Sequence, residues 1–218
     1  MSIVRTSYRV GILGGTFDPI HVGHLRFARL ARRRLGLERV YLQPALHPGH
    51  RLGPRPAAAA HRVAMVALAT TRDPQLRLLP PEFGVRSGRP TYTVEVLEAL
   101  RRVLPSRTSL FFLLGSDAFQ ELATWHRWRE LPGLATLVVA DRPGYSSSQQ
   151  TAALERRLRR LADASQSPVC WLQGVQRAVS ATRIRERARH GASLTGWVPP
   201  AVGRYILKYG LYKTEGIH

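Results

Sequence analysis

Residues 8–24 read Tyr-Arg-Val-Gly-Ile-Leu-Gly-Gly-Thr-Phe-Asp-Pro-Ile-His-Val-Gly-His, and this stretch decides the fold. Its first six residues are an apolar run that predicts a buried strand, and paired glycines end the run before a helical pattern begins. The first amide groups of a helix lack intrahelical partners and carry the positive end of the helix dipole, so they bind anions. Glycine also lets the backbone approach a phosphate closely. The sequence therefore predicts a nucleotide phosphate site between Gly14 and His24.

An alternation of strand and helix patterns continues along the chain. Further strand-like runs lie at 40–42, 76–79, 110–114, 136–140 and 169–172, and helical patterns lie at 27–35, 57–71, 93–104, 118–131, 154–161, 182–190 and 200–209. This alternation predicts an α/β fold with a Rossmann-like, doubly wound parallel sheet, flanking helices and ligands at the carboxyl ends of the strands. We expect one domain over residues 1–218 that ends in a small C-terminal helical segment, about 180–218. Residues 142–150 are expected to form a surface loop.

The charge of the chain is unusual. The 218 residues include 33 Lys and Arg against 14 Asp and Glu, a net charge of +19, and Lys208 and Lys213 are the only lysines. Such a field attracts nucleotides, nucleic acid or anionic lipid, and an arginine bias spread over solvated surfaces would give the same number. The single cysteine, Cys170, excludes an internal disulfide framework. No apolar run approaches the ~20 residues of a membrane span, so we expect a cytoplasmic protein.

The two histidines at the start of the helical pattern, His21 and His24, have three interpretations. The segment is neither G-x-G-x-x-G nor a P-loop, so those two ways of binding phosphate are excluded. His21 and His24 could ligate a metal, but only Asp18 is near them in sequence as a further ligand. One of them could simply cap the following helix. Contact with a phosphate is the interpretation that the glycine-rich junction favours.

Four blocks of the chain resemble one family. Gly14 to His24 is similar to the H-x-G-H signature of nucleotidyltransferases, and its Phe-Asp-Pro-Ile-His form resembles bacterial nicotinate mononucleotide adenylyltransferases. Gly115-Ser116-Asp117 with Trp125-His126-Arg127-Trp128, then Ser180 to Arg185, then residues 199–212, resemble later blocks of that family. The resemblance covers nearly the whole chain. It implies adenylyl transfer from ATP to nicotinate mononucleotide, giving nicotinate adenine dinucleotide and pyrophosphate in NAD biosynthesis, by in-line attack without a covalent enzyme intermediate.

The resemblance also implies roles for individual residues. The catalytic residues would be His21, His24 and Arg185. ATP would be bound by Gly14, Gly15, Thr16, Phe17, His21, His24, Ser180, Thr182 and Arg185. The second substrate would be bound by Asp117 at its ribose, Trp125 at its pyridine ring, Thr91, Tyr92 and Thr93 at its carboxylate, and Arg51 at its phosphate. Mg²⁺ would be held mainly by substrate phosphates and water, without a protein metal site.

Several of these residues have a simpler structural interpretation. Asp117 could be an ordinary helix N-cap, and Trp125, Trp128 and Tyr92 could be core aromatics. Trp125 and Trp128 are three residues apart, so they could share a helical face. The chain also departs from the family pattern. Arg51 stands where a lysine is usual, Glu95 where an aspartate is usual, and Ala181 where a second serine is frequent, and none of these changes removes a group that the chemistry requires.

Two other functions compete with the first. A related adenylyltransferase would use nicotinamide mononucleotide or phosphopantetheine, and the block from Trp125 to Trp128 argues against it. A basic nucleic-acid-binding protein would account for the net charge, but the arginines of 154–161 and 183–189 alternate with apolar residues as on solvated helix faces. We expect no specific nucleic acid or membrane partner, while a homo-oligomer is possible.

Overall fold

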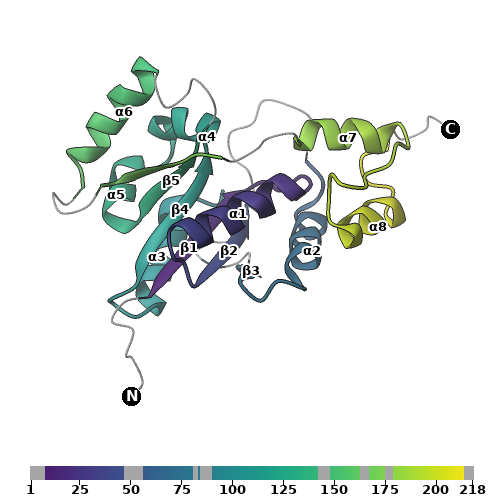
Figure 1. Ribbon diagram of the computed structural model, residues 1–218, viewed down its shortest axis with the longest axis horizontal. Helices are drawn as coiled ribbons and strands as arrows, with labels where there is room; N and C mark the ends of the chain where they lie inside the picture. Colours follow the sequence, from purple (N-terminus) through teal and green to yellow (C-terminus); the bar gives the residue numbers. More distant parts are fainter. Residues whose placement is uncertain are drawn as a thin grey trace.

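The computed structural model describes residues 8–46, 56–80, 83, 90–141, 148–162, 167–174 and 179–213. Within these ranges, parallel strands form one sheet (Figure 1): β1 Arg9–Gly15, β2 Arg39–Pro44, β3 Leu76–Leu78, β4 Ser109–Gly115, β5 Thr136–Ala140 and β6 Val169–Leu172. The strand order is β3-β2-β1-β4-β5-β6, which confirms the predicted doubly wound sheet. The order reverses between β1 and β4, and in such sheets the ligand crevice lies at the carboxyl ends of those two strands.

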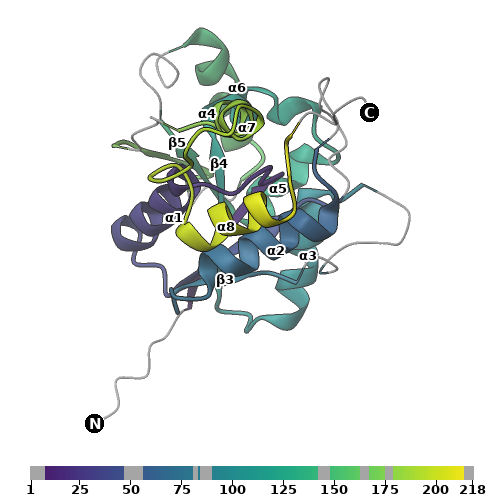
Figure 2. The same ribbon diagram turned by 90° about the vertical axis from the view of Figure 1, so that its right-hand side faces the viewer.

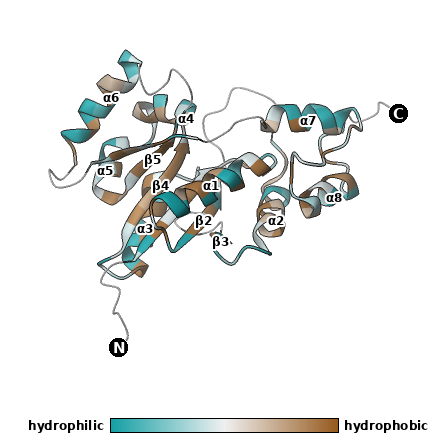
Figure 3. Cartoon of the chain, viewed as in Figure 1, coloured by the Kyte–Doolittle hydropathy of each residue, from teal (hydrophilic) through white to brown (hydrophobic). Residues whose placement is uncertain are grey.

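Helices cover both faces of the sheet. One face packs against α1 Val22–Arg34 and α2 Ala59–Thr70, and the other against α3 Thr93–Val103, α4 Ser116–Gln120, α5 Leu131–Leu134 and α6 Gln149–Arg159. Helices α7 Ala181–Arg189 and α8 Pro200–Lys208 extend the core of the first face beyond α2. Strand β4 shows why, because Phe111 and Leu113 join the first core while Leu110, Phe112 and Leu114 join the second. Side chains alternate along a strand, so a continuous apolar run is buried on both faces. Figure 3 shows this hydrophobic band on β4 and β5.

The C-terminal helices pack against the first part of the chain. Helix α8 lies beside α2 (Figure 2), and Val202 and Ile206 of α8 are buried in the core that α1 and α2 share. The amide of Val22, the first residue of α1, donates to the carbonyl of Trp197 at 3.1 Å. Helix α8 and the segment before it therefore pack against the start of α1 and against α2. In the part of the chain that the structure describes, no helix is both long and apolar enough to cross a membrane.

The region between β4 and β5 differs from the expected helix at 118–131. Helix α4 ends at Gln120, two 3-10 turns follow at Leu122–Thr124 and Trp128–Glu130, and α5 comes last. Arg127 has a φ of +51°, a left-handed conformation that stops a helix, and its guanidinium pairs with Glu98 and Glu130. Trp125 and Trp128 therefore share no helical face: the second is buried and the first is half-buried. Thr93 begins α3 as its first helical residue, and Tyr92 takes the cap position.

Candidate active site

The glycines at the end of β1 have almost no room for a side chain. A Cβ at Gly14 would lie 2.9 Å from the Phe112 ring, and one at Gly15 would lie 3.1 Å from the Phe17 ring. Phe17 has a φ of +50° and is only 2% exposed, because its ring is part of the core. The loop thus turns sharply out of the sheet with Phe17 as its anchor. Because the Phe17 ring is buried, only the backbone of Phe17 is available to contact a ligand.

His21 and His24 lie together at the N-terminus of α1. Their rings are stacked with centroids 3.7 Å apart, and the His21 amide donates to Nδ1 of His24 at 3.3 Å. His24 therefore helps cap the helix, and in its neutral form it carries the proton on Nε2. His21 is 6% exposed, and although its Nδ1 makes no close hydrogen bond with a described residue, its side chain faces the backbone amide of His24 in a capping box. Burial lowers the pKa of His21 to about 4, so the unliganded protein holds a neutral imidazole there at pH 7.

Gly23 makes room for this pair. A Cβ at Gly23 would lie 3.0 Å from the His21 ring and 3.7 Å from the carbonyl oxygen of Val179. A side chain there would push the imidazole aside. The same distances show that the start of α1 abuts the residues that lead into α7.

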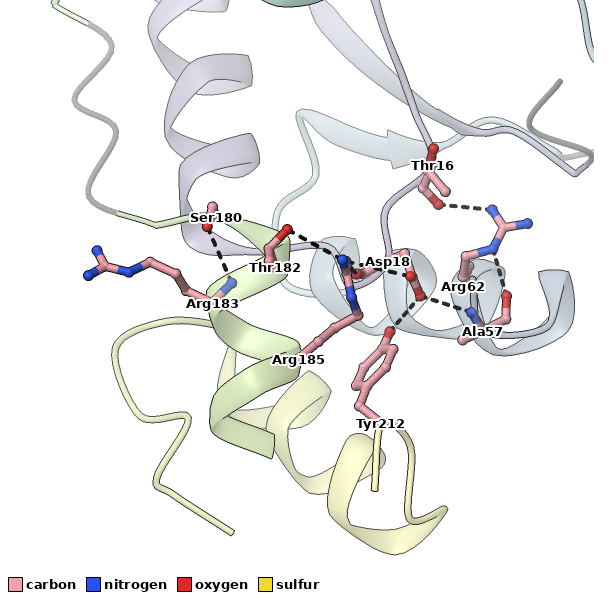
Figure 4. A network of polar contacts seen from close by, with 9 residues as sticks. All are labelled: Thr16, Asp18, Ala57, Arg62, Ser180, Thr182, Arg183, Arg185 and Tyr212. Carbon is pink, nitrogen blue, oxygen red and sulfur yellow. Dashed lines mark hydrogen bonds and ion pairs between the residues drawn. The ribbon is translucent and has the colours of Figure 1, made fainter. Parts of the chain in front are cut away.

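The N-terminus of α7 brings Ser180, Thr182 and Arg185 to the same edge of the sheet (Figure 4). Ser180 caps the helix, since its hydroxyl accepts from the Arg183 amide at 3.3 Å. Arg185 donates from Nη1 to the backbone carbonyl of Asp18 at 2.8 Å and from Nη2 to the Thr182 hydroxyl at 3.3 Å. The N-termini of α1 and α7 therefore lie close together. The Asp18 to Arg185 contact, which spans 167 residues of sequence, joins the two segments. Each helix N-terminus carries partial positive charge, which favours an anion at this place.

Arg62 is a structural residue of this site that the sequence did not reveal. It is 1% exposed and donates to four backbone carbonyls: Ala57 at 2.9 Å, Thr16 at 2.9 Å, Ala45 at 2.6 Å and Leu46 at 3.0 Å. Burial lowers its pKa, and the nearby charge of Asp18 opposes that shift. Arg62 thus connects the loop at residues 14–18, here called the glycine loop, to both chain segments that flank residues 47–55. Its position in an alanine-rich helix gave no sign of this role.

The residues predicted to bind the second substrate lie around the ends of β4 and α3. The Tyr92 ring lies against that of His126 at a tilt of 33°, with centroids 4.3 Å apart. Trp125 is half-buried and meets Phe112 edge to face at 6.1 Å. The Phe112 ring also packs against Gly14, so it lies between Trp125 and the glycine loop. These contacts bring Tyr92 and Trp125 to the same end of the sheet as the histidines.

Three further residues were predicted to bind the second substrate: Asp117, Thr91 and Arg51. Asp117 is exposed in the first turn of α4, whose cap position is Gly115, so its interpretation as an N-cap is wrong. Thr91 directly precedes α3. Arg51 lies outside the described residues.

Buried polar atoms without partners also mark this edge. Among the described residues they include Oγ1 of Thr91, Oε2 of Glu95 and Oγ of Ser116, besides Nδ1 of His21. Ser116 follows β4 directly, and Thr91 and Glu95 lie at the start of α3. Buried polar groups in native proteins are nearly always paired. Another such atom among the described residues, Oγ1 of Thr108, lies at the opposite edge of the sheet, just before β4.

A cavity of about 660 Å³ opens at the opposite edge of the sheet. Its wall includes Arg9, Thr108 and Thr136, at the beginnings of β1, β4 and β5. None of the predicted site residues lines it. Ligands of doubly wound sheets bind at the carboxyl ends of the strands, and this cavity lies at the opposite ends.

Similarity to known proteins extends over nearly the whole chain. Residues 12–187 match the Cytidylyltransferase-like family. The chain is 39% identical over 208 residues to a probable nicotinate-nucleotide adenylyltransferase from Bordetella petrii, covering 94% of this chain and 99% of that one. It is 41% identical over 219 residues to a protein of the same description from Aeromonas hydrophila, with 94% and 97% covered.

A solved structure has the same fold. Plasmodium falciparum nicotinic acid mononucleotide adenylyltransferase complexed with NaAD aligns with a TM-score of 0.72 at 15% identity, covering 94% of this chain and 97% of that one. At this identity the likeness supports the fold alone.

Proposed function

The chain belongs to the nicotinate-nucleotide adenylyltransferases of the cytidylyltransferase-like family, and from that premise we propose that its carboxyl-edge site performs the family's reaction. The phosphate of nicotinate mononucleotide attacks the α-phosphorus of ATP. A bond forms from the attacking oxygen to that phosphorus, the bond to the bridging oxygen of the β-phosphate breaks, and pyrophosphate leaves. The products are nicotinate adenine dinucleotide and pyrophosphate.

The convergence of two helix N-termini with His21, His24 and Arg185 carries this proposal. The attacking phosphate is already an anion near neutral pH, so the protein needs no nucleophile of its own. It has to position two phosphates in line and stabilise the charge that accumulates on the transferring and leaving oxygens. Amide groups at Gly15 and Thr16, together with the imidazoles, supply donors for these oxygens.

Each side of the phosphate chain has its own set of contacts in this proposal. The ATP phosphates lie against Gly14 to Phe17, with His21 and His24 donating to them. Ser180, Thr182 and Arg185 bind the triphosphate tail from the opposite side. His21 meets its phosphate as a neutral imidazole.

The donor set suits phosphate better than a protein-bound metal. The described residues at the site offer imidazoles, a guanidinium and hydroxyls, whereas Mg²⁺ prefers carboxylate and water oxygens. The nearby carboxylate, Asp18, already accepts hydrogen bonds from Tyr212 and Ala57. We therefore assign Mg²⁺ to the substrate phosphates, where it neutralises charge and lowers the energy of the transition state.

The pyridine nucleotide is assigned to the β4 and α3 side of the crevice. The exposed Asp117 accepts hydrogen bonds from ribose hydroxyls, the half-buried Trp125 stacks on the pyridine ring, and the backbone from Thr91 to Thr93 receives the carboxylate. Arg51 is assigned to the mononucleotide phosphate. A cytoplasmic location is also part of this proposal.

The test is an assay of purified protein with Mg-ATP and one of three acceptors: nicotinate mononucleotide, nicotinamide mononucleotide or phosphopantetheine. Pyrophosphate release is measured together with the dinucleotide or dephospho-coenzyme product. We expect equal amounts of pyrophosphate and nicotinate adenine dinucleotide, and the highest kcat/KM with the nicotinate substrate. A higher kcat/KM with either other acceptor would overturn the substrate assignment. No turnover with any acceptor would overturn the enzymatic function.

A further inference from the structure

Asp18 is the point at which four segments of the chain meet (Figure 4). Its Oδ1 accepts from the Tyr212 hydroxyl at 2.9 Å and from the Ala57 amide at 3.1 Å. Its Oδ2 lies 3.7 Å from Nη1 of Arg185, and its backbone carbonyl accepts from the same nitrogen at 2.8 Å. The residue is only 9% exposed. A carboxylate so enclosed fixes the groups around it relative to one another.

These contacts determine where the Arg185 guanidinium lies. An arginine side chain has several rotatable bonds, and a charged head without a fixed partner samples many positions. Here the Asp18 contacts hold Nη1, and the Thr182 hydroxyl, 3.3 Å away, holds Nη2. A guanidinium has five N–H donors, so others remain for phosphate oxygens. The arginine is thus oriented before a ligand arrives, which lowers the entropic cost of reaching the transition state.

Tyr212 ties Asp18 to the end of the described chain. Its φ of +69° is uncommon for a residue other than glycine and persists where the surroundings hold it. Burial raises the pKa of Tyr212, and the charge of Asp18 and their hydrogen bond raise it further. The phenol therefore keeps its proton and acts as the donor to Asp18. This hydrogen bond links the turn after α8 to Asp18, and Leu211 and Tyr212 of the same turn also pack against the core.

We propose that Asp18 is a positioning residue that holds Arg185 against the ATP phosphates, and that Tyr212 in turn holds Asp18. The inference rests on the proposed function, because Arg185 acts there on the triphosphate. It assigns a role in turnover to a tyrosine that contacts neither substrate. The rate of adenylyl transfer then depends on the docking of the segment that follows α8.

The test is a double-mutant cycle on steady-state kinetics. Asp18→Asn keeps the size of the residue and an oxygen for Tyr212 and Ala57, but it removes the charge that faces Arg185. We expect kcat to fall about 10- to 100-fold with a smaller change in the KM for ATP, the loss expected for a catalytic group displaced by about 1 Å. In an Arg185→Ala background, the same substitution should cost less than about twofold, because groups that act as a unit are not additive.

Tyr212→Phe should lower kcat several-fold and should also have no effect in the Arg185→Ala background. The matched control is Tyr205→Phe, which removes a hydroxyl from the same C-terminal segment. That hydroxyl pairs with His61 at 3.0 Å and not with Asp18, so we expect an unchanged kcat. Equal losses from Asp18→Asn in both backgrounds, or an unchanged kcat, would overturn the proposal. Should that variant fail to fold, the cycle of Tyr212→Phe with Arg185→Ala decides the question in the same way.

A second readout does not depend on activity. Crystal structures of the wild-type and Asp18→Asn proteins should show the Arg185 guanidinium farther from the side chain of residue 18 in the variant. An Arg185 that stays in place would overturn the positioning role. If the wild-type protein transfers no adenylyl group, the proposed function fails, while the crystal structures still report whether Asp18 positions Arg185.

Discussion

Replacement of Arg62 by methionine should lower the stability of the folded protein. Methionine fills much of the space of the arginine side chain but donates no hydrogen bonds. The Thr16, Ala45, Leu46 and Ala57 carbonyls would each lose the guanidinium contact that they have now. Because Arg62 is 1% exposed, the loss occurs away from bulk water, where an unpaired acceptor is costly.

The magnitude follows from two opposing contributions. A hydrogen bond from a charged donor contributes roughly 1.5–3 kcal/mol to stability, and Arg62 makes four. Removing the buried charge recovers several kcal/mol of desolvation cost. We expect the free energy of unfolding to fall by about 3–5 kcal/mol, the range for breaking a buried charged contact. That is a large part of the roughly 5–15 kcal/mol that stabilises a folded protein.

Urea unfolding, followed by circular dichroism, measures this loss. With a slope of about 2 kcal/mol per molar urea, the midpoint should fall by roughly 1.5–2.5 M. The matched control is Arg33→Met in the last turn of α1, an exposed arginine, which should change the free energy by less than about 0.5 kcal/mol. Arg62→Lys keeps the charge with only three donors and should lie between the two. A midpoint for Arg62→Met within the range of the control would refute the reasoning.

The remaining predictions concern the histidines and the pyridine subsite. His24→Ala should lower kcat about 10²- to 10³-fold, as expected for one lost transition-state donor, with an unchanged circular dichroism spectrum; a near-normal kcat would leave His24 with a capping role only. His21 should make the protein less stable in acid. Its folded pKa of about 4 lies below its ordinary value of 6.5, so the unfolded state alone binds the proton as pH falls from about 6.5 to 4. At about 1.4 kcal/mol per pKa unit, the full loss is roughly 3 kcal/mol. Urea midpoints across that range should fall less steeply for His21→Asn than for wild type, and parallel curves would contradict the assignment. Trp125→Ala should raise the KM for nicotinate mononucleotide about tenfold, in line with stacking on one ring, and leave the KM for ATP unchanged; equal rises in both values would place Trp125 outside the pyridine subsite.

Most of the fold was predictable because its signals are local. Continuous apolar runs such as Leu110 to Leu114 predict strands buried on both faces, and helical spacing between them predicts the crossovers. The region 118–131 was predicted wrongly as one helix. Helix α4 already ends at Gln120, and the extended Trp125 and left-handed Arg127 interrupt the rest of the segment. Arg127 pairs with Glu98 of α3, a contact 29 residues away. Spacing within a segment carries no information about such a partner.

The candidate site was predictable where its residues lie in contiguous motifs. Gly14 to His24 runs from the end of β1 into α1, and Ser180 to Arg185 contains the cap and first residues of α7, the helix that follows β6. Their meeting at one edge is what the topology of a parallel sheet predicts. Arg62 and Tyr212 were missed for a physical reason. Arg62 binds backbone carbonyls, which any sequence provides, and an arginine in a chain of net charge +19 is ordinarily solvated. Tyr212 reaches Asp18 across 194 residues, and no local pattern indicates that pairing.

A crystal structure with a non-hydrolysable ATP analogue and Mg²⁺ tests the location of the reaction most directly. We expect the phosphates between the N-termini of α1 and α7, within about 3 Å of donors on His21, His24 and Arg185. The adenine and ribose should then lie along the carboxyl edge of the sheet. Phosphates bound instead in the cavity beside Arg9 and Thr108, at the opposite edge, would contradict the account.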